Sequence, residues 1–251
     1  MWLSILMLYF SGTAASAGSG VIKVSCVGDS ITYGYLSTEG MTYPAQLQNL
    51  LGSGYKVSNF GSNGRTMLKS SDYPYWNTSQ YQAALDSNPD IVVLMLGTND
   101  AKYYNWGPHS SEYPIDYLDM VSVFQSLPSR PQVFTMIPPP LYKDGQYDMN
   151  QTVINSFYPG TDLPGSIRAI AQTAGLPPPI DLFDVFQAHC PVVQGTPGHN
   201  ASHELVTCDW IAHGGTDACH PNNSGYGQIA QAVKNTLLEA MSRLRDAHLM
   251  S

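Results

Sequence analysis

The feature that most constrains the fold is the segment 90–96, which is apolar without interruption from Ile91 to Leu96. A strand this uniformly apolar is typical of a parallel sheet that is covered on both faces. Shorter candidate strands lie before and after it, and segments with helical spacing of apolar residues alternate with them. The sequence therefore predicts an α/β fold, a three-layer α/β/α sandwich with a central parallel sheet that is flavodoxin-like in strand order.

The expected elements follow one another along the whole chain. Strands are expected at residues 21–26, 56–60, 90–96, 132–137 and 180–182, and helices at residues 43–51, 80–86, 114–125, 164–174 and 225–247. Residues 141–157 form a longer polar stretch to which the sequence assigns no structure, and residues 183–219, rich in His, Gly and Pro, are expected to be a loop.

The first seventeen residues predict a signal peptide. Residues 1–10 are apolar over too short a span to cross a bilayer, and Ala15-Ser16-Ala17 matches a small-residue cleavage pattern, although no Lys or Arg precedes them. The alternative is a terminal strand or helix that folds into the domain. We expect a secreted protein with one domain at residues 18–251, in agreement with glycosylation sequons at Asn77, Asn150, Asn200 and Asn222.

Charge limits the partners of this chain. The net charge is −8, with only 11 Lys and Arg residues. Such a balance argues against a nucleic acid or an anionic membrane surface as a partner. No segment after the first seventeen residues is apolar enough for a transmembrane helix. The oligomeric state is left open.

The four cysteines are interpreted in the light of export. Cys26 lies in the first expected strand and is expected to be a buried thiol. Two of Cys190, Cys208 and Cys219 could pair in an oxidising compartment. The preferred pairing is Cys208–Cys219, which closes a short loop.

Histidines near these cysteines raise the question of a metal site. The histidines in question are His109, His189, His199, His203 and His213. No pair of them matches the spacing of a standard zinc site, so no metal is expected.

Polar or glycine-rich turns follow three of the expected strands at the point where each strand ends. Ser30 follows the first strand, Gly64 the second and Asn99 the third. Because the carboxyl ends of parallel strands lie along one edge of a sheet, we expect these residues to converge. Asp217 and His220, three residues apart before the last helix, share one side of a turn. These residues provide the nucleophile, base, orienting acid and oxyanion donors that ester hydrolysis by serine requires.

Four motifs in this order resemble the SGNH hydrolases, also called GDSL esterases. The motifs are Gly28-Asp29-Ser30-Ile31, Asn59-Phe60-Gly61-Ser62-Asn63-Gly64, Gly97-Thr98-Asn99-Asp100 and Asp217-Ala218-Cys219-His220-Pro221. Together they span most of the chain that follows the expected signal peptide. The resemblance implies the SGNH hydrolase fold and a serine carboxylic ester hydrolase without a cofactor.

The resemblance also implies a role for each catalytic residue. Ser30 would be the nucleophile, and His220 the general base that later acts as an acid toward the leaving alcohol. Asp217 would orient His220. The backbone N–H groups of Ser30 and Gly64 and the side-chain amide of Asn99 would form the oxyanion hole.

The glycine of the second motif has two candidates. Gly61 and Gly64 both fit the family position. Gly64 is preferred because it directly precedes Arg65-Thr66, as in carbohydrate-acetylesterase relatives.

Four further residues are candidates for contact with the substrate: Asp29, Asp100, Trp76 and Trp106. For each of them a structural role is the alternative. Asp29 could shape the turn before Ser30, and Asp100 could cap a helix. The two tryptophans could stack on sugar rings or pack beneath the loops.

The expected substrate is a short-chain, acetyl ester on a carbohydrate. The aromatic stretches 73–76 and 105–106, and Pro138-Pro139-Pro140 with Ile154-Asn155, look similar to those of secreted carbohydrate and sialate O-acetylesterases. The main alternative is a lipase or lysophospholipase that acts on longer acyl chains, with residues 141–157 as the source of an apolar insertion. A non-catalytic glycan-binding protein and an acyltransferase are further alternatives.

Overall fold

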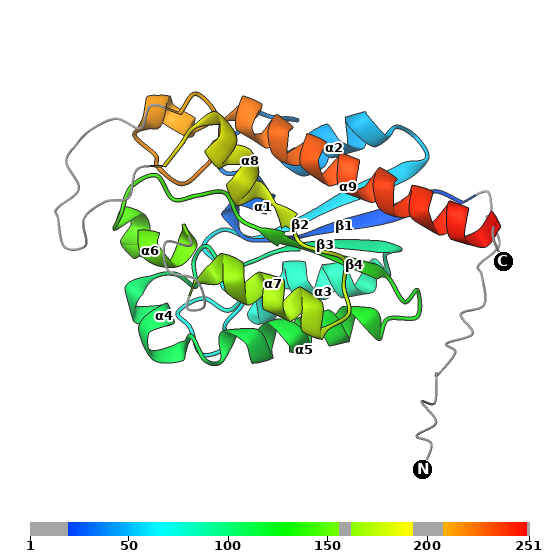
Figure 1. The fold of residues 1–251 in the computed structure, drawn as a ribbon, viewed down its shortest axis with the longest axis horizontal. Coiled ribbons are helices and arrows are strands. Elements are labelled where there is room, and N and C mark those ends of the chain that lie inside the picture. Colours follow the sequence, from blue (N-terminus) through cyan, green and yellow to red (C-terminus); the bar gives the residue numbers. More distant parts are fainter. Residues whose placement is uncertain (1–19, 156–161, 193–207, 250–251) are drawn as a thin grey trace, which may run out of the picture.

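The computed structural model describes residues 20–155, 162–192 and 208–249 (Figure 1). Its centre is one sheet in the order β2-β1-β3-β4-β5, with all paired strands parallel. The strands are β1 (Ile22–Gly28), β2 (Tyr55–Gly61), β3 (Ile91–Met95), β4 (Gln132–Ile137) and β5 (Ile180–Asp181). This order is that of flavodoxin-like sheets, which confirms the predicted fold class.

Helices cover both faces of the sheet (Figure 1). On one face lie α1 (Ser30–Tyr33), α2 (Tyr43–Leu51), α8 (Leu182–His189) and α9 (Asn223–Leu249). On the other lie α3 (Ser79–Asp86), α4 (Tyr103–His109), α5 (Tyr113–Gln125), α6 (Gln151–Ile154) and α7 (Leu163–Thr173). The ends of the predicted strands, and of the predicted helices that correspond to α2, α3, α5, α7 and α9, differ from the observed ends by at most two residues.

Strand β3 has apolar side chains on both faces, which explains why helices cover both faces of the sheet. Its residues 91, 93 and 95 pack in a hydrophobic cluster with α2, α8 and α9, whereas Val92 and Leu94 pack in a second cluster with α3, α5 and α7. All five side chains of the strand are buried. Burial of apolar surface on both faces is the main stabilising contribution here, as the uninterrupted apolar run predicts.

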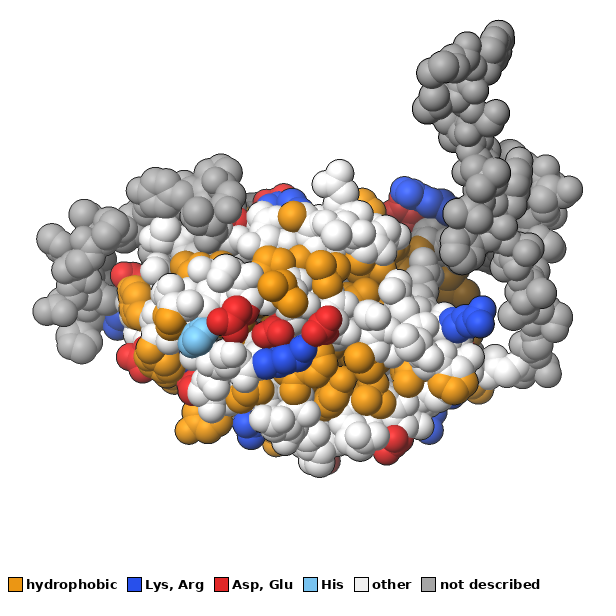
Figure 2. All heavy atoms as spheres, turned by 90° about the horizontal axis from the view of Figure 1, so that it is seen from below, with side chains coloured by type: hydrophobic (Ala, Val, Ile, Leu, Met, Phe, Trp, Pro, Cys, Tyr) orange, Lys and Arg blue, Asp and Glu red, His pale blue; other side chains and the backbone are white. Residues whose placement is uncertain are grey.

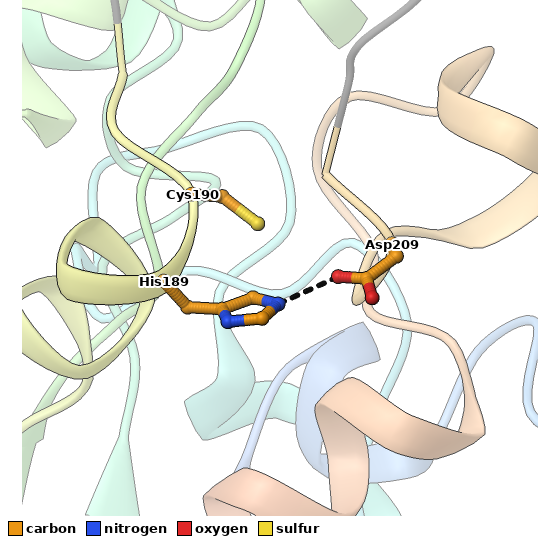
Figure 3. A group of neighbouring side chains, drawn as sticks. All are labelled: His189, Cys190 and Asp209. Carbon is orange, nitrogen blue, oxygen red and sulfur yellow. Dashed lines mark hydrogen bonds and ion pairs between the residues drawn. The ribbon is translucent and has the colours of Figure 1, made fainter.

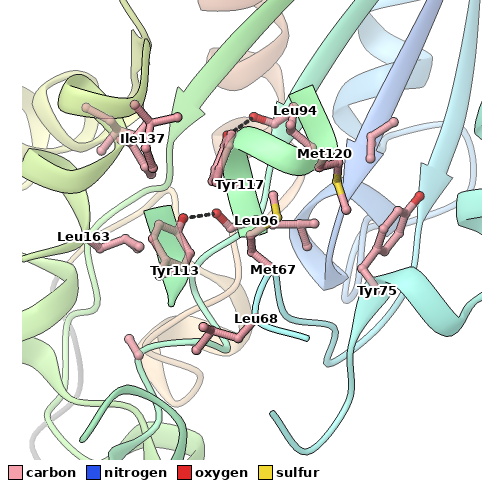
Figure 4. Packing of buried hydrophobic residues seen from close by; sticks show 14 of the residues in the cluster. Met67, Leu68, Tyr75, Leu94, Leu96, Tyr113, Tyr117, Met120, Ile137 and Leu163 are labelled. Carbon is pink, nitrogen blue, oxygen red and sulfur yellow. Dashed lines mark hydrogen bonds between the residues drawn. The ribbon is translucent and has the colours of Figure 1, made fainter. Parts of the chain in front are cut away.

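Two buried tyrosines of α5 hold the end of β3 in place (Figure 4). The hydroxyl of Tyr113 donates to the carbonyl of Leu96 at 2.8 Å, and that of Tyr117 donates to the carbonyl of Leu94 at 3.2 Å. Each ring thus fills the core while its polar end is satisfied. The next residue, Gly97, has a φ of +143°, and a Cβ there would lie 2.8 Å from the Tyr113 hydroxyl. This packing fixes the point from which the segment with Asn99 begins.

The expectation of a loop over residues 183–219 is wrong in its first part, because α8 occupies residues 182–189. The Asp181 side chain accepts the backbone N–H of Asp184 and so caps this helix. Leu182 and Phe186 bury its apolar face against the sheet. The signal was present in the sequence as an aspartate before an apolar pair at helical spacing, but the surrounding His, Gly and Pro residues obscured it.

The disulfide pairing also differs from the prediction. Cys190 is bonded to Cys208, with 5.3 Å between their Cα atoms, rather than Cys208 to Cys219. Because α8 extends to residue 189, it delivers Cys190 to the segment that begins at residue 208. Cys219 is a buried free thiol, and so is Cys26, as expected.

Some sequence predictions concern residues outside the described ranges. The expected signal peptide and the sequon at Asn200 lie there, as do His199 and His203. Within the described residues, none of the helices is long and apolar enough to cross a bilayer.

Figure 2 shows the face below the sheet in Figure 1, where charged side chains form one group among hydrophobic ones. Helix α5 lies on this side of the sheet (Figure 1), and its Asp119 pairs with Lys69 at 2.6 Å.

Candidate active site

Ser30, His220 and Asp217 form one hydrogen-bonded chain at the carboxyl edge of the sheet. The Oγ of Ser30 lies 2.9 Å from Nε2 of His220, and Nδ1 of His220 lies 2.9 Å from Oδ2 of Asp217. All three residues are buried. The order hydroxyl, imidazole, carboxylate is the arrangement by which serine hydrolases activate a nucleophile.

The turn between β1 and α1 places Ser30 at this edge. The Asp29 carboxylate accepts the backbone N–H of Ile31 at 2.9 Å and so caps α1. Gly28 has no room for a side chain, because a Cβ there would lie 2.4 Å from the carbonyl oxygen of Met95. The glycine therefore lets the two central strands approach each other just before the serine.

The spacing of three between Asp217 and His220 has a local explanation. Oδ1 of Asp217 accepts the backbone N–H groups of Cys219 at 2.9 Å and His220 at 2.8 Å. This turn directs the other carboxylate oxygen toward the imidazole ring. Burial opposes the charge of Asp217, but the hydrogen bonds from His220 and Cys219 outweigh it and lower the pKa of Asp217 well below its usual range. Asp217 is therefore ionised.

Three groups of hydrogen-bond donors surround Ser30. The backbone N–H groups of Ser30 and Gly64 donate to no residue that the structure describes. The side-chain nitrogen of Asn99 donates to Oδ2 of Asp29 at 3.3 Å and to the carbonyl of Arg65 at 3.1 Å. Ser30, Gly64 and Asn99 line the same cavity. N–H donors that line a cavity beside a nucleophile are candidates to stabilise an oxyanion.

The two glycines of the second motif have different surroundings. Gly61 ends β2 beneath α1, where a Cβ would lie 2.0 Å from the backbone nitrogen of Tyr33. Gly64 lines the cavity, has a φ of +72° and has open space beside it. The geometry therefore favours Gly64, the preferred candidate, as the residue that faces a substrate.

The cavity above Ser30 has a volume of about 430 Å³. Besides Ser30, His220, Gly64 and Asn99, its lining consists of Tyr35, Asn63, Thr98, Lys102, Tyr104, Tyr147, Asp148, Met149 and Cys219. Three of these residues are tyrosines with exposed fractions of 40–51%: Tyr35, Tyr104 and Tyr147. Sequence reasoning missed all three, although Tyr35 and Tyr104 each lie five residues after a motif residue. No sequence feature around Tyr147 indicated that it would line the cavity.

The profile of the GDSL-like lipase/acylhydrolase family matches residues 26–228. The chain belongs to this family. The resemblance seen in the four motifs is thus confirmed, and with it the assignment to the carboxylic ester hydrolases.

Individual relatives of this GDSL-like hydrolase are esterases. An acetylxylan esterase of Xylanibacter ruminicola is 37% identical over 152 residues. This match covers 53% of the chain but 31% of that protein, so the chain spans less than a third of its relative's length.

Solved structures of esterases share the fold of this GDSL-like hydrolase. An acetyl xylan esterase superposes with a TM-score of 0.60 at 21% identity, over 86% of this chain and 99% of that one. A carbohydrate acetylesterase from Sinorhizobium meliloti superposes with a TM-score of 0.57 at 18% identity, over 87% of this chain and 99% of that one. A putative arylesterase from Agrobacterium tumefaciens superposes with a TM-score of 0.55 at 18% identity, over 87% of this chain and 99% of that one. At these identities the likeness establishes the fold alone.

Neither of the two tryptophans expected at the substrate lines the cavity of the GDSL-like hydrolase. The indole nitrogen of Trp76 donates to the carbonyl of Met67 at 2.7 Å. Trp106 is buried, with its ring centroid 5.3 Å from that of Tyr113. Both rings thus make the packing contacts that were the alternative for them, Trp106 as a buried residue and Trp76 as a half-buried one.

Asp29 and Asp100 are both fully buried, and neither lines the cavity. Asp100 accepts the backbone N–H groups of Met67 at 2.9 Å and Leu68 at 2.7 Å and so holds the segment that follows the second motif. Burial raises the pKa of Asp29 to about 6 and that of Asp100 to about 7.

One group of side chains has the composition of a metal site (Figure 3). The potential ligand atoms of His189, Cys190 and Asp209 all lie within 4.8 Å of one another. However, the sulfur of Cys190 is bonded to Cys208 and is no thiolate. Nε2 of His189 donates to Oδ1 of Asp209 at 2.7 Å, and the imidazole ring stacks on that of Trp210 with 3.8 Å between centroids. These residues therefore join the end of α8 to the segment after residue 208 without a complete ligand set.

Proposed function

We propose that this chain is a secreted serine esterase that removes acetyl groups from a carbohydrate. The observation that carries the proposal is the hydrogen-bonded chain from Ser30 through His220 to Asp217 at the wall of an open cavity. Ester hydrolysis explains why a buried aspartate, a histidine and a serine hydroxyl are held in this order.

In the proposed reaction, Ser30 Oγ attacks the ester carbonyl carbon while Nε2 of His220 takes the hydroxyl proton. Asp217 holds the Nδ1 proton of the resulting imidazolium. The oxyanion of the tetrahedral intermediate accepts hydrogen bonds from the N–H groups of Ser30 and Gly64 and from the amide of Asn99. The amide of Asn99 exchanges one of its two hydrogen bonds, to Asp29 or to Arg65, for this one. The C–O bond to the alcohol then breaks, and His220 donates its proton to the leaving oxygen.

Water resolves the acyl-enzyme in the second half of the reaction. His220 takes a proton from the water, whose oxygen attacks the acyl carbon, and the second tetrahedral intermediate collapses. The bond to Ser30 Oγ breaks, the proton returns to the serine, and acetate leaves. No cofactor is needed for either half-reaction.

Two observations support a carbohydrate as the alcohol part. The relative that matches in sequence is an acetylxylan esterase. The three half-exposed tyrosines of the cavity offer flat faces, of the kind on which sugar rings stack. Secretion is supported by the predicted signal peptide and by the Cys190–Cys208 disulfide, which is typical of oxidising compartments.

The test is the initial rate on nitrophenyl esters from acetate to decanoate and the release of acetate from acetylated xylan. Ser30→Ala is the blank, and Ser53→Ala, at an exposed serine far from the cavity lining, is the matched control. We expect the rate to fall steeply beyond the shortest acyl groups, and only Ser30→Ala to lose activity.

Other results would replace the proposal. A rate that holds or rises with acyl length would indicate a lipase or lysophospholipase. Acceptor-dependent transfer of the acyl group would indicate an acyltransferase. Absence of Ser30 labelling by a fluorophosphonate would indicate a binding protein without catalysis.

A further inference from the structure

A tyrosine outside all four motifs contacts the acidic member of the catalytic chain. The hydroxyl of Tyr147 donates to Oδ2 of Asp217 at 2.7 Å. This is the same oxygen that lies 2.9 Å from Nδ1 of His220. Since Oδ1 accepts two backbone N–H groups, the carboxylate is held by donors at both of its oxygens.

The ring of Tyr147 also contacts the histidine itself. Its centroid lies 5.6 Å from that of His220, at an interplanar angle of 66°. The ring of Tyr35 makes a similar contact at 4.8 Å and 63°. Such edge-to-face contacts are favourable and limit rotation of the imidazole. Tyr147 therefore contacts both partners of the Asp217–His220 hydrogen bond.

The backbone that presents Tyr147 adopts an unfavourable conformation. Tyr147 has a φ of +52° and Asp148 a φ of +63°, in the left-handed region that non-glycine residues rarely adopt. Such conformations persist only where the surroundings enforce them, and they are found preferentially at functional sites.

Hydrogen bonds on either side enforce the conformation here. The N–H of Gly145 donates to the carbonyl of Met149 at 3.0 Å, which closes the turn. Met149 forms a β-bridge with Lys102, and the N–H of Asn150 donates to the carbonyl of Ala101 at 2.9 Å. The turn is thereby attached to the segment that begins with Asn99.

We propose that Tyr147 is a positioning residue of the esterase, which fixes the Asp217 carboxylate in the orientation that His220 requires. The inference rests on the proposed function. The tyrosine acts through Asp217 rather than on the substrate. Its hydroxyl remains a donor over the working pH range, because burial and the hydrogen bond to Asp217 both raise the pKa of Tyr147 well above its usual value.

The test compares Tyr147→Phe, which keeps the ring and removes the hydroxyl, with Tyr147→Ala, which removes both. Tyr33→Phe is the matched control, because Tyr33 is also about half exposed and does not line the cavity. We expect Tyr147→Phe to lower kcat about 10- to 100-fold, the effect of losing one hydrogen bond to a charged group, with KM within about twofold of wild type. Tyr147→Ala should also raise KM, since part of the cavity wall is lost.

A second measurement does not depend on catalysis. The proton between His220 Nδ1 and Asp217 gives a low-field ¹H NMR resonance when the hydrogen bond is ordered. In folded Tyr147→Phe protein, Oδ2 of Asp217 has lost one of the donors that fix its orientation, so we expect this resonance to broaden and move upfield as the hydrogen bond becomes less ordered, whereas Tyr33→Phe should leave it in place. The thermal unfolding transition of each variant verifies that it is folded.

The outcomes separate the two proposals. If the wild-type protein hydrolyses no ester, the proposed function fails. If the wild type is active but Tyr147→Phe keeps its kcat and its low-field resonance, only the inference about Tyr147 is overturned. A change confined to KM would also overturn it, because Tyr147 would then act as a wall of the cavity and nothing more.

Discussion

The side-chain nitrogen of Asn99 lies 3.3 Å from the Asp29 carboxylate and donates a hydrogen bond to it. Because the same nitrogen also donates to the carbonyl of Arg65, one amide joins the segments that follow β1, β2 and β3. The strand ends that carry Ser30 and Gly64 are thus held together before any substrate arrives.

We predict that Asn99→Ala and Asn99→Asp each lower kcat about 100-fold or more, as loss of one oxyanion donor does in other hydrolases, with a smaller change in KM. Asp keeps the size of the side chain but donates no hydrogen bond and adds a negative charge beside Asp29. Ala removes the donor without that charge, so a loss of kcat common to both variants is due to the donor. Steady-state kinetics on nitrophenyl acetate measure the effect. An Asn99→Asp enzyme with nearly wild-type kcat would exclude Asn99 from the oxyanion hole.

The buried carboxylates predict how stability depends on pH. The pKa values of Asp29 and Asp100 are raised from 3.8 to about 6 and about 7, so each binds its proton more tightly in the folded chain than in the unfolded chain. Their stabilising contribution is complete below the unfolded pKa and is lost as the pH rises through the folded values. We expect the free energy of unfolding to fall by about 6 kcal/mol between about pH 4 and pH 7, the sum of the two contributions. The lowered pKa of Asp217 acts in the opposite sense and only at lower pH.

Urea unfolding at several pH values measures this slope. Asp100→Asn should flatten it, whereas Asp86→Asn, at an exposed carboxylate of α3, should leave it unchanged. If the free energy of unfolding depended on pH equally in wild type and Asp100→Asn, the raised pKa of Asp100 would be refuted.

The disulfide gives a prediction that tests the corrected pairing. The cysteines are 18 residues apart, and a cross-link of that span contributes about 3 kcal/mol to stability. We expect the double variant Cys190→Ser, Cys208→Ser to lose about that much in urea unfolding. The unfolded wild type should expose two reactive thiols, Cys26 and Cys219, before reduction. A peptide map that links Cys208 to Cys219 would contradict the structure.

Alanine at each glycine of the second motif should lower stability, but by different amounts. Gly61→Ala places a Cβ against the backbone of Tyr33 and should cost about 3 kcal/mol or prevent folding. Gly64→Ala meets no atom but keeps a positive φ, which costs about 1–2 kcal/mol. Denaturant unfolding gives both values, and the reverse order would contradict the geometry.

Most of the fold could be predicted because its signals are local. The apolar run of β3 and the spacing within the helices depend on residues that are neighbours in sequence. Convergence of Ser30 and Asn99 follows from the parallel sheet, and the pairing of Asp217 with His220 follows from one turn.

The features that the sequence could not predict depend on contacts between segments that are distant in sequence. Nothing in the sequence around Tyr147 indicates two left-handed residues, since neither is glycine. The pattern around Trp76 and Trp106 suits stacking on a sugar as well as packing in a core, and only the finished structure separates the two. The disulfide partner of Cys208 depends on where α8 ends.

Ser30 and His220 are 190 residues apart, and α9, which follows His220, packs against α2. A ribosome delivers the chain from its N-terminus, so early domains or segments can begin to fold first. A growing chain therefore carries its serine long before it carries the histidine. If the proposed roles hold, a nascent chain cannot cleave esters by this mechanism until residue 220 has been added and folded against Ser30.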